Sequence, residues 1–443
     1  LSYSTALNTQ TGVQVLMERV SESFGEDRSR VDMAEQFIGP ILGYLEELEF
    51  VKKVAFAVSY RRRTPTIGDL DIIATSSEGE AASEAFVNYD SVSEVLSQGE
   101  TKTSVRLRSG LQVDLRIVPE DSYGAAMLYF TGSKAHNIHL RNIAVEKDLK
   151  INEYGVFQGD ERLLGETEAE IYEHFGMPFI EPELRKDTGE IEAAMKDELP
   201  ELLTLADIRG DLQMHTKESD GEHSLEEMAE EAKELGYDYI AITDHTSYIG
   251  VTQGLEADDV SAYVDKIDAF NEKQDSLQVL KGVEVDIHEN GQLDLPNDSL
   301  EKFDVVLGSI HSHFNLNEEK QTERILKAME NPNFNILAHP TTRRIGERES
   351  IELQMEKIME AALARGCFLE INASPERLDI WDQYIRLAGD MGLKLVISTD
   401  AHRKSNLRNI EYGVFQARRG WAEKAQILNT YPLEELLNSL KRE

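Results

Sequence analysis

Apolar residues recur at helical spacing between residues 33 and 48, which predicts an amphipathic helix. The next apolar runs, residues 51–60 (VKKVAFAVSY) and 68–76 (GDLDIIATS), are short and predict strands. Residues 104–118 (SVRLRSGLQVDLRIV) predict two strands around a Ser-Gly turn, a pattern typical of a hairpin. One helix followed by these strands indicates a small α+β sheet domain.

After residue 207 the pattern changes to helical stretches that alternate with short apolar strands. The helix before the first of these strands opens with Ser224 and Glu227, the pattern of a capping box. The expected strands cover residues 239–245, 279–287, 303–312, 334–340, 368–374 and 393–402. Strand–helix alternation at this spacing predicts a parallel βα barrel. The acidic, polar stretch 181–206 has prolines near both ends and is expected to be a linker.

Length and composition fit a protein of several domains. The chain has 443 residues, of which 40% are hydrophobic, so two or three packed cores are expected. No apolar run approaches the roughly 18 residues that span a bilayer, and the first residues lack the pattern of a secretory signal. The single cysteine, Cys367, fits a reducing compartment, so a soluble cytoplasmic protein is expected. The absence of an initiating Met suggests a fragment or a processed chain.

The net charge of −37 argues against a uniformly basic surface of the kind that binds nucleic acid. The charge is uneven, because residues 51–150 hold 13 Lys/Arg against 13 Asp/Glu and residues 151–200 hold 4 against 14. An acidic average can therefore hide a locally basic groove. Adaptation to salt is the other explanation, and the sequence leaves both open.

Ligand-type residues fall at the ends of the expected barrel strands. They are Asp244, His245, Glu284, His311, His339, Asp400 and His402. A lone histidine is more often a surface or core residue than a ligand. In a βα barrel, however, the C-terminal strand ends open onto one face, so these side chains are expected to converge. Imidazole and carboxylate groups suit Zn²⁺ or Mn²⁺, and such clusters activate water to cleave phosphoesters.

The motifs GDLQMHTKESDGEHS (210–224), ITDHT, GVEVDI, GSIHSH, LAHP and STDAH resemble the PHP (polymerase and histidinol phosphatase) family. This resemblance, from about residue 208 to the end, implies a distorted (β/α)7 barrel with a trinuclear metal site. The implied ligands are His215, Asp220, His245, Glu284, His311, His339, Asp400 and His402. The family motif His-x-His begins here with Gln213, whose neutral amide oxygen is a much weaker ligand than imidazole. His223 and His313 lie outside the family pattern and are expected beside the site or on the surface.

The first half carries a second set of acidic residues. Asp69 and Asp71 stand two apart on an expected strand, so their side chains leave the same face. Asp114 lies on a neighbouring strand between apolar residues, where an unpaired carboxylate is costly. Three converging carboxylates can hold Mg²⁺ for in-line phosphoryl transfer. A D-x-D motif alone is weak evidence, but the basic run 61–63 just before it is placed to meet a triphosphate.

The block SYRRRTPTIGDLD, the later VDLR and the segment YFTGS (129–133) together resemble family X DNA polymerases over roughly residues 30–160. The resemblance implies a nucleotidyltransferase palm in which Asp69, Asp71 and Asp114 are catalytic and hold two Mg²⁺ ions. Asp114 would deprotonate or position the primer 3′-hydroxyl. The implied nucleotide-binding residues are Ser59 and Arg62 on the phosphates, Gly68, Tyr129 and Phe130 at the sugar, Gly132 and Asn137. Arg141 would contact DNA, and LKINEYGVF (149–157) resembles a thumb segment.

Val58 stands where the family usually has a glycine that lets a phosphate approach the backbone, so we expect weaker dNTP binding. The basic lyase-like domain and the helix-hairpin-helix of the family are also missing from this sequence, which partly accounts for its acidity. The expected domains are a remnant of the helical fingers (1–50), the palm (51–120), the thumb (121–180), the linker (181–206) and the PHP domain (207–443).

A palm followed by a PHP barrel is the arrangement of bacterial and archaeal family X polymerases, and the whole chain resembles them. The implied function is gap filling in DNA repair, including base excision repair, with a Mn²⁺- or Zn²⁺-dependent 3′-5′ exonuclease or phosphoesterase. The expected partners are gapped or primed DNA and dNTPs but no membrane, and a monomer is expected. Two alternatives stay open: a histidinol-phosphatase-like phosphoesterase with a vestigial palm, and a repair scaffold whose sites are decaying.

Overall fold

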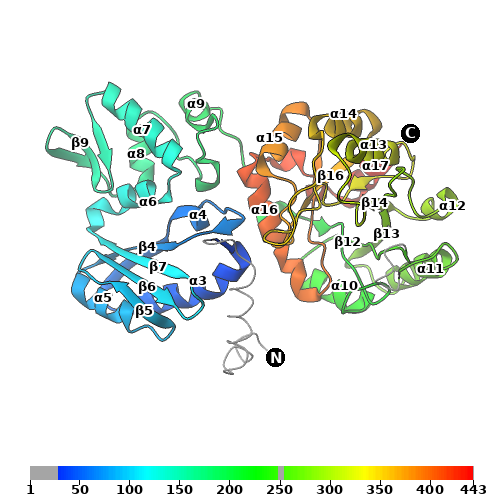
Figure 1. Ribbon diagram of the computed structural model, residues 1–443, viewed down its shortest axis with the longest axis horizontal. Helices are drawn as coiled ribbons and strands as arrows, with labels where there is room; N and C mark the ends of the chain where they lie inside the picture. The colour runs from blue at the N-terminus through cyan, green and yellow to red at the C-terminus, as the bar shows by residue number, and fades with distance from the viewer. Residues whose placement is uncertain (1–27, 248–253, 443) are drawn as a thin grey trace. The chain divides into compact units, whose positions relative to one another are not determined.

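The chain divides into two compact units, which meet in the sequence between Leu199 and Pro200 (Figure 1). The computed structural model describes residues 28–247 and 254–442. Residues 1–27 of the expected fingers remnant therefore lie outside the described residues. In the described part of the chain, no helix combines the length and apolar character needed to cross a membrane.

The first unit begins with helix α3 (Val31–Glu46), which buries one apolar face and agrees with the helix expected from the sequence. Its main sheet has five strands in the order β2-β4-β7-β6-β5. The strands are β2 (Val51–Phe56), β4 (Leu70–Ser76), β5 (Val92–Ser97), β6 (Lys102–Leu107) and β7 (Gln112–Val118). Strand β4 pairs in parallel with β7, and the other pairs are antiparallel. The sequence predicted four of these strands and missed β5.

Two short elements separate β2 from β4. The segment expected as one strand over 51–60 bends at Val58 into helix α4 (Val58–Arg61). Strand β3 (Thr66–Ile67) then pairs with β1 (Ser29–Arg30). Helix α5 (Gly79–Val87) follows β4.

The rest of the first unit is built around helix α6 (Tyr123–Thr131), whose residues 124–128 are all buried. Helix α6 packs closely on the start of α8 (Glu168–His174), since a Cβ on Gly124 would lie 2.2 Å from the Thr167 carbonyl carbon. Helix α7 (Lys134–Glu146) follows α6. A three-stranded antiparallel sheet then joins β8 (Lys150–Asn152), β9 (Gly155–Gln158) and β10 (Glu161–Leu164).

The segment 181–206 differs in part from the expected linker. Residues 182–184 form a 3-10 turn and Glu190–Met195 form helix α9. Arg185 and Glu190 are both 0% exposed. These two charged residues are paired rather than solvated, because Arg185 contacts Glu168 at 2.6 Å and Glu190 contacts His136 at 2.7 Å. Composition alone could not distinguish such buried pairs from a polar linker.

The second unit is a barrel of seven parallel strands that follow one another in chain order, from β11 to β17. A parallel bridge between Met214 and Ala401 links the first strand to the last. The strands are β11 (Gly210–Asp211), β12 (Tyr239–Ile242), β13 (Gln278–Asp286), β14 (Val305–Ser309), β15 (Ile336–Leu337), β16 (Phe368–Asn372) and β17 (Leu395–Ser398). The predicted (β/α)7 barrel is confirmed.

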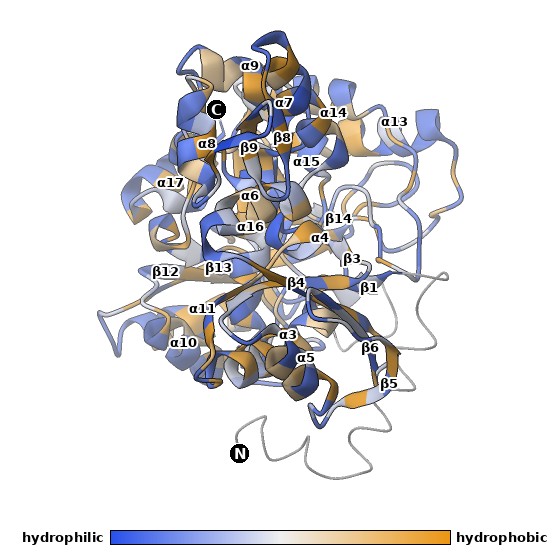
Figure 2. Cartoon of the chain, turned by 90° about the vertical axis from the view of Figure 1, so that its left-hand side faces the viewer, coloured by the Kyte–Doolittle hydropathy of each residue, from blue (hydrophilic) through white to orange (hydrophobic). Residues whose placement is uncertain are grey.

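Helices surround these strands (Figure 1). They are α10 (Leu225–Glu234), α11 (Val260–Asn271), α12 (Asn297–Leu300), α13 (Glu318–Ala328), α14 (Met355–Arg365), α15 (Asp382–Met391), α16 (Ile410–Arg419) and α17 (Leu433–Leu440). Figure 2 shows both hydrophilic and hydrophobic residues on α10, α11 and α17, as expected of helices that cover a core. The capping box predicted at Ser224 and Glu227 is present.

Successive strand residues enter two different apolar clusters. Ile240 and Ile242 pack in the large cluster that the surrounding helices share. Tyr239 and Ala241 belong to a smaller cluster, which contains residues from every part of the barrel wall and from α17. This alternation follows from the two-residue period of a strand. The smaller cluster therefore fills the inside of the barrel.

Candidate functional site

The inner face of the barrel changes from apolar to polar toward the C-terminal ends of the strands. On β13, Leu280 lies in the inner cluster, and Glu284 follows on the same face four residues later. On β16 the same face carries Phe368 and then the fully buried Glu370. The fold thus brings the strand-end residues predicted from the sequence to one end of the barrel.

Three overlapping groups of side chains in the described residues could hold a metal ion, and all belong to the second unit. Within each group, the candidate ligand atoms lie within 4.8 Å of one another. The groups are His215, Asp220, His245 and His402; His245, Glu284 and His311; and His215, Glu284 and Asp400. Seven of the eight ligands implied by the family resemblance are therefore brought together.

Glu284 lies at the centre of these groups and is 1% exposed. Its Oε2 is 3.3 Å from His215 Nε2, and its Oε1 is 3.4 Å from His311 Nε2. The eighth implied ligand, His339, belongs to none of the three groups. Its Nε2 nevertheless lies 3.1 Å from Glu284 Oε1, so it borders the cluster.

Burial and close pairing shift the acid–base properties of these groups. Burial would raise the pKa of Glu284, but His245, His215, His339 and His311 outweigh it and hold that pKa well below its usual range. The same competition, with His402 as the strongest partner, lowers the pKa of Asp220 to about 2. Both carboxylates are therefore ionised near neutral pH.

Several buried polar atoms at this end of the barrel have no hydrogen-bond partner. Among the described residues they include Nδ1 of His215, His245 and His339, and Oε1 of Gln213. Such atoms are costly to bury unless something satisfies them. Together with ionised carboxylates, this set of nitrogen and oxygen donors fits one or more divalent cations.

Gln213, which takes the place of the first histidine of the family motif, points into the same cluster. Its side chain is fully buried, and its Nε2 donates a hydrogen bond to Glu284 Oε2 at 2.8 Å. The amide thus faces the shared carboxylate, as an imidazole at this position would.

Asp244 lies two residues after β12 and supports the site instead of joining a metal group. It accepts hydrogen bonds from Thr216 N and Ser219 Oγ, both at 2.7 Å, and from Tyr263 Oη at 3.1 Å. These bonds hold the loop that carries Asp220. The sequence motif placed Asp244 beside His245 but could not separate the two roles.

Two further residues support the cluster, and the sequence did not single them out. Asp286 Oδ1 lies 3.3 Å from His311 Nδ1, and Asp286 is two residues after Glu284 on the same strand. Glu370 Oε2 accepts a hydrogen bond from the backbone N–H of His339 at 2.7 Å. The two-residue spacing in GVEVDI was the available signal for Asp286.

The two histidines expected beside the site or on the surface differ in their surroundings. His313 has 46% of its side chain exposed and lies 3.8 Å from Glu289. His223 Nδ1 is buried without a hydrogen-bond partner, and its carbonyl accepts a bond from Lys217 N at 3.0 Å. Neither belongs to a metal group.

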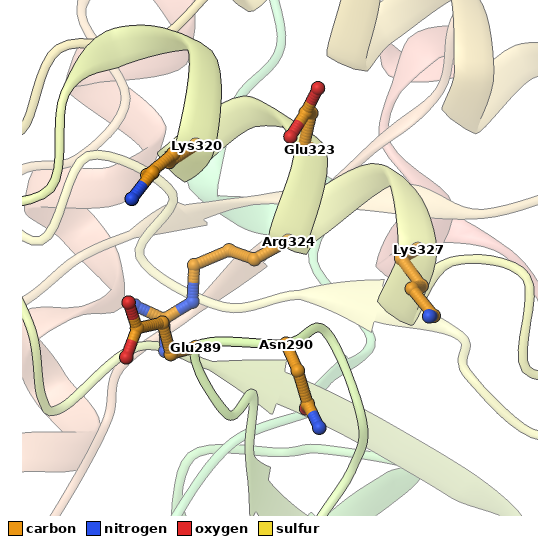
Figure 3. A pocket seen from close by; sticks show the side chains of 6 residues that line it. All are labelled: Glu289, Asn290, Lys320, Glu323, Arg324 and Lys327. Atoms are coloured by element: carbon orange, nitrogen blue, oxygen red, sulfur yellow. The ribbon is translucent and has the colours of Figure 1, made fainter.

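A cavity of about 510 Å³ lies between the loop after β13 and α13 (Figure 3). Its lining is Glu289, Asn290, Lys320, Glu323, Arg324 and Lys327. The Arg324 guanidinium crosses this space, and its Nη1 donates to the Ser312 carbonyl at 3.1 Å. None of the lining residues belongs to a metal group, so this cavity is separate from the ligand cluster.

In the first unit, Asp71 and Asp114 are direct partners in the parallel pair β4 and β7. Asp71 Oδ1 lies 3.3 Å from Arg116 Nε, and Asp114 Oδ2 lies 2.8 Å from Lys102 Nζ. Asp69 precedes β4 and is exposed. Two of the three carboxylates thus lie side by side on neighbouring strands, and each has a cationic partner.

The two paired carboxylates differ in basicity. Burial, followed by the charge of Asp114, raises the pKa of Asp71. Burial also acts on Asp114, but hydrogen bonds from Lys102, Ser104 and Gln112 outweigh it and lower the pKa of Asp114. Asp114 is therefore the carboxylate held more firmly in its charged form.

The expected phosphate-binding residues lie on the turn around α4. Ser59 is 6% exposed, and Arg62 Nη1 donates to the Thr131 carbonyl at the end of α6. Gly132 lies against the same guanidinium, since its Cβ would be 3.3 Å from Arg62 Nη1. Gly68 lies in the turn just before Asp69.

Val58 has a φ of 57°, in the left-handed region that β-branched residues avoid. This finding gives a conformational reason why glycine suits the position. The valine side chain packs at the edge of a small apolar cluster with Ile73 and Met127.

The expected nucleoside-binding residues are connected through α6 and α7. Asn137 Nδ2 donates to the Tyr129 carbonyl at 2.7 Å, and Arg141 Nε donates to the Asn137 carbonyl at 3.3 Å. Phe130 carries the Arg116 guanidinium over its ring, with Cζ 4.3 Å from the centroid. Arg116 also contacts Asp71, so Phe130 is linked to the carboxylates through one side chain.

Arg61, beside Arg62, has a structural connection that the basic run did not reveal. Its Nη1 donates to Glu168 Oε1 at 2.8 Å and to Thr131 Oγ1 at 2.7 Å. Glu168 also contacts the fully buried Arg185 at 2.6 Å. Two arginines therefore share one carboxylate between α4 and α8.

Two family models match the chain. The DNA polymerase beta thumb matches residues 126–186, and the PHP domain matches residues 211–374. The first match covers α6 to α8, and the second begins at β11 and ends just after β16.

Three relatives show how the similarity is distributed. The DNA polymerase/3′-5′ exonuclease PolX of Bacillus subtilis is 38% identical over 434 residues, which cover 96% of this chain and 76% of the relative. A probable phosphatase of a Thermoanaerobacter species is 30% identical over 245 residues, 52% of this chain and 95% of the phosphatase. DNA polymerase lambda of Arabidopsis thaliana is 26% identical over 161 residues, 29% of this chain and 30% of that polymerase.

Proposed function

This chain belongs to the bacterial PolX family of DNA polymerase/3′-5′ exonucleases, and we propose that its two units carry two separate metal-dependent sites for phosphoryl transfer on DNA. Polymerisation is assigned to the first unit and 3′-5′ exonucleolysis to the barrel. The observation that carries the second assignment is the set of overlapping His/Glu/Asp groups at the C-terminal end of the barrel.

For polymerisation, Asp69, Asp71 and Asp114 would hold Mg²⁺, which when bound neutralises the charge of a nucleotide triphosphate. Asp114 is the proposed acceptor of the proton from the primer 3′-hydroxyl. The low pKa of this carboxylate keeps it ionised, as a proton acceptor requires. Ser59 and Arg62 would bind the phosphates, since both lie on the turn before these carboxylates.

The nucleoside would bind against α6 and α7. Tyr129, which is 37% exposed, and Phe130 would pack against the sugar. Asn137 would contact the base pair and Arg141 the DNA. The bond from Asn137 to the Tyr129 carbonyl supports this grouping, because it fixes one helix relative to the other. The proposed DNA substrate is a short gap or a primed end, as in base excision repair.

For exonucleolysis, the ligands His215, Asp220, His245, Glu284, His311, His339, Asp400 and His402 would hold Mn²⁺ or Zn²⁺. Bound metal of this kind lowers the pKa of water and stabilises charge on phosphate oxygens. Asp244 and Asp286 would orient the ligands, since Asp244 bonds the loop that carries Asp220 and Asp286 Oδ1 lies 3.3 Å from His311 Nδ1. Gln213 would leave one position with a weaker ligand than the family motif provides.

Two variants of the full chain test this division of labour. Asp114→Ala is expected to abolish dNTP incorporation on a one-nucleotide gap and to leave Mn²⁺-dependent 3′ digestion intact. His339→Ala is expected to show the opposite pattern. Equal incorporation by wild type and Asp114→Ala would refute the polymerase assignment, and 3′ digestion that survives His339→Ala would refute the ligand assignment.

A second candidate for the barrel is hydrolysis of a small phosphomonoester. It is favoured by the similarity to probable phosphatases, one of which matches over 95% of its own length. Turnover of histidinol phosphate without release of nucleotides from a 3′ end would support it. Metal analysis of the purified chain separates both activities from a decayed site, because a decayed site would retain less than about one ion per chain.

A further inference from the structure

Arg377 brings a fixed positive charge to the ligand cluster of the barrel, although no motif singled it out. It lies in the loop after β16, and its Nε is 3.3 Å from Asp400 Oδ2. Only 16% of its side chain is exposed. Asp400 is itself a member of a metal group, so the guanidinium borders the proposed site directly.

The guanidinium has hydrogen-bonding capacity that the protein does not use. Arginine carries five N–H donors in a planar fork. The Nη1 atom of Arg377 is buried and has no hydrogen-bond partner among the described residues. A buried donor without an acceptor is costly, so its retention beside the cluster indicates an acceptor that binds there.

The chemistry of the surroundings indicates an anionic acceptor. Arginine stays protonated in proteins. Burial is the largest cause that lowers the pKa of His339, and the positive charge of Arg377 is the second. A permanent cation next to ligands for metal ions repels those ions. This repulsion is offset when the ligand that binds brings negative charge of its own, as a phosphoester does.

The loop that carries Arg377 is held in place before any ligand binds. Arg343 Nε donates to the Arg377 carbonyl at 2.5 Å, and the Arg343 guanidinium stacks on Trp381 at 3.8 Å from the ring centroid. At the far side of the loop, Asp379 accepts bonds from Thr341 N and Oγ1 at 2.8 and 2.9 Å. The guanidinium is therefore positioned in advance, which reduces the entropic cost of binding.

We propose that Arg377 binds a non-bridging oxygen of the phosphoester cleaved in the barrel, using its free Nη1 while Nε stays on Asp400. This inference rests on the proposed function of the barrel and adds a substrate-binding residue to it. The ligand it recognises is a phosphate group, whether that group is part of a DNA end or of a small molecule.

The test compares wild type with Arg377→Gln and Arg377→Lys in the full chain supplied with Mn²⁺. The matched control is Arg344→Gln, because Arg344 is 40% exposed and pairs with Glu347 and Glu376 on the surface. Three quantities are measured: kcat/KM for 3′ digestion of a single-stranded oligonucleotide, bound Mn²⁺ per chain, and the affinity for inorganic phosphate by calorimetry.

We expect Arg377→Gln to lower kcat/KM by roughly 10- to 100-fold, the usual range for one charge-assisted hydrogen bond. Phosphate affinity should fall with it, and Arg377→Lys should recover part of both. Bound Mn²⁺ should stay the same or rise. A purely structural role through Asp400 would instead lower the metal content, and that result would overturn the proposal.

The outcomes also separate this inference from the proposed exonuclease. If wild type fails to digest the oligonucleotide but binds phosphate at least about tenfold more tightly than Arg377→Gln, the exonuclease assignment fails and the role of Arg377 stands. Equal phosphate affinity in wild type and Arg377→Gln overturns the role of Arg377, whatever the digestion assay shows.

Discussion

Replacing Gln213 with histidine is expected to strengthen metal binding in the barrel. The side chain is 0% exposed, and its Nε2 lies 2.8 Å from Glu284 Oε2. Its Oε1 is buried without a hydrogen-bond partner. An imidazole at this position would face the same carboxylate and offer a nitrogen ligand that an amide lacks.

The magnitude follows from three contributions. Without metal, the variant loses a hydrogen bond to a charged group, worth about 1.5–3 kcal/mol, and also loses a buried unsatisfied oxygen that costs about 1–3 kcal/mol. These terms nearly cancel, so the metal-free stability should change little. Residues that merely orient metal ligands change metal affinity about 10- to 100-fold. A direct ligand should therefore raise it by at least about tenfold, or 1.4 kcal/mol.

The assay is a titration of metal-free protein with Mn²⁺ in the presence of a competing chelator, followed by metal analysis after dialysis. Gln416→His serves as the control, because Gln416 is also buried, at 2% exposed, and also has an unpartnered Oε1. Gln213→His should bind more tightly or retain more ion per chain, whereas Gln416→His should match wild type. Identical affinity and stoichiometry in Gln213→His and wild type would show that this position does not face the metal.

Three further predictions concern stability. Val58→Gly should be more stable than Val58→Ala by about 1 kcal/mol in calorimetric unfolding, because both variants lose the two γ-methyl groups but only glycine relieves a φ of 57°; equal stabilities would contradict the conformational argument. Glu168→Gln should destabilise the chain by about 3–5 kcal/mol, since it leaves the fully buried Arg185 without its carboxylate, and calorimetry should show no such loss for Glu173→Gln, an exposed position on the same helix. Burial raises the pKa of Asp211 to about 7. Protonated Asp211 therefore stabilises the folded chain fully below the ordinary aspartate pKa near 4, and this stabilisation is lost as the pH rises through 7. Asp211→Asn should reduce this pH-dependent loss of stability, measured by urea unfolding with tryptophan fluorescence. The fluorescence reports the second unit, because both tryptophans, Trp381 and Trp421, belong to it. A pH profile of stability equal to that of wild type would contradict the prediction.

The barrel and most of its proposed ligands could be predicted because most of these residues lie at or just after the end of an apolar run in the sequence. His311 and Asp400 come just after apolar runs, and parallel strands must open their C-terminal ends on one side. The family pattern also supplied His215 and Asp220, which lie in a loop that no strand pattern marks. The sequence thus predicted the cluster through local order along the chain.

Other features depend on contacts between distant residues and could not be predicted in this way. The segment 51–60 has the pattern of one strand, but the backbone turns at Val58 because the chain must enter α4. The buried pairing of Arg185 with Glu168 joins residues 17 positions apart and turns a polar segment into part of a core. Arg377 has no motif of its own, and its position beside Asp400 appears only when two strand ends are brought together.

Lys102 and Arg116 pair with Asp114 and Asp71, so the proposed polymerase site would work by counterion exchange. A metal–nucleotide complex that bound these carboxylates would replace two cations that remain tethered to the chain. Lys102, with 43% of its side chain exposed, can swing toward the incoming triphosphate and keep its charge within the site. The net charge around the carboxylates would then change less than it would if a free divalent ion bound there alone, because the ion arrives with the negative charge of the nucleotide. Because tethered cations are not diluted by the solvent, this exchange should depend less on bulk salt than the release of free ions does.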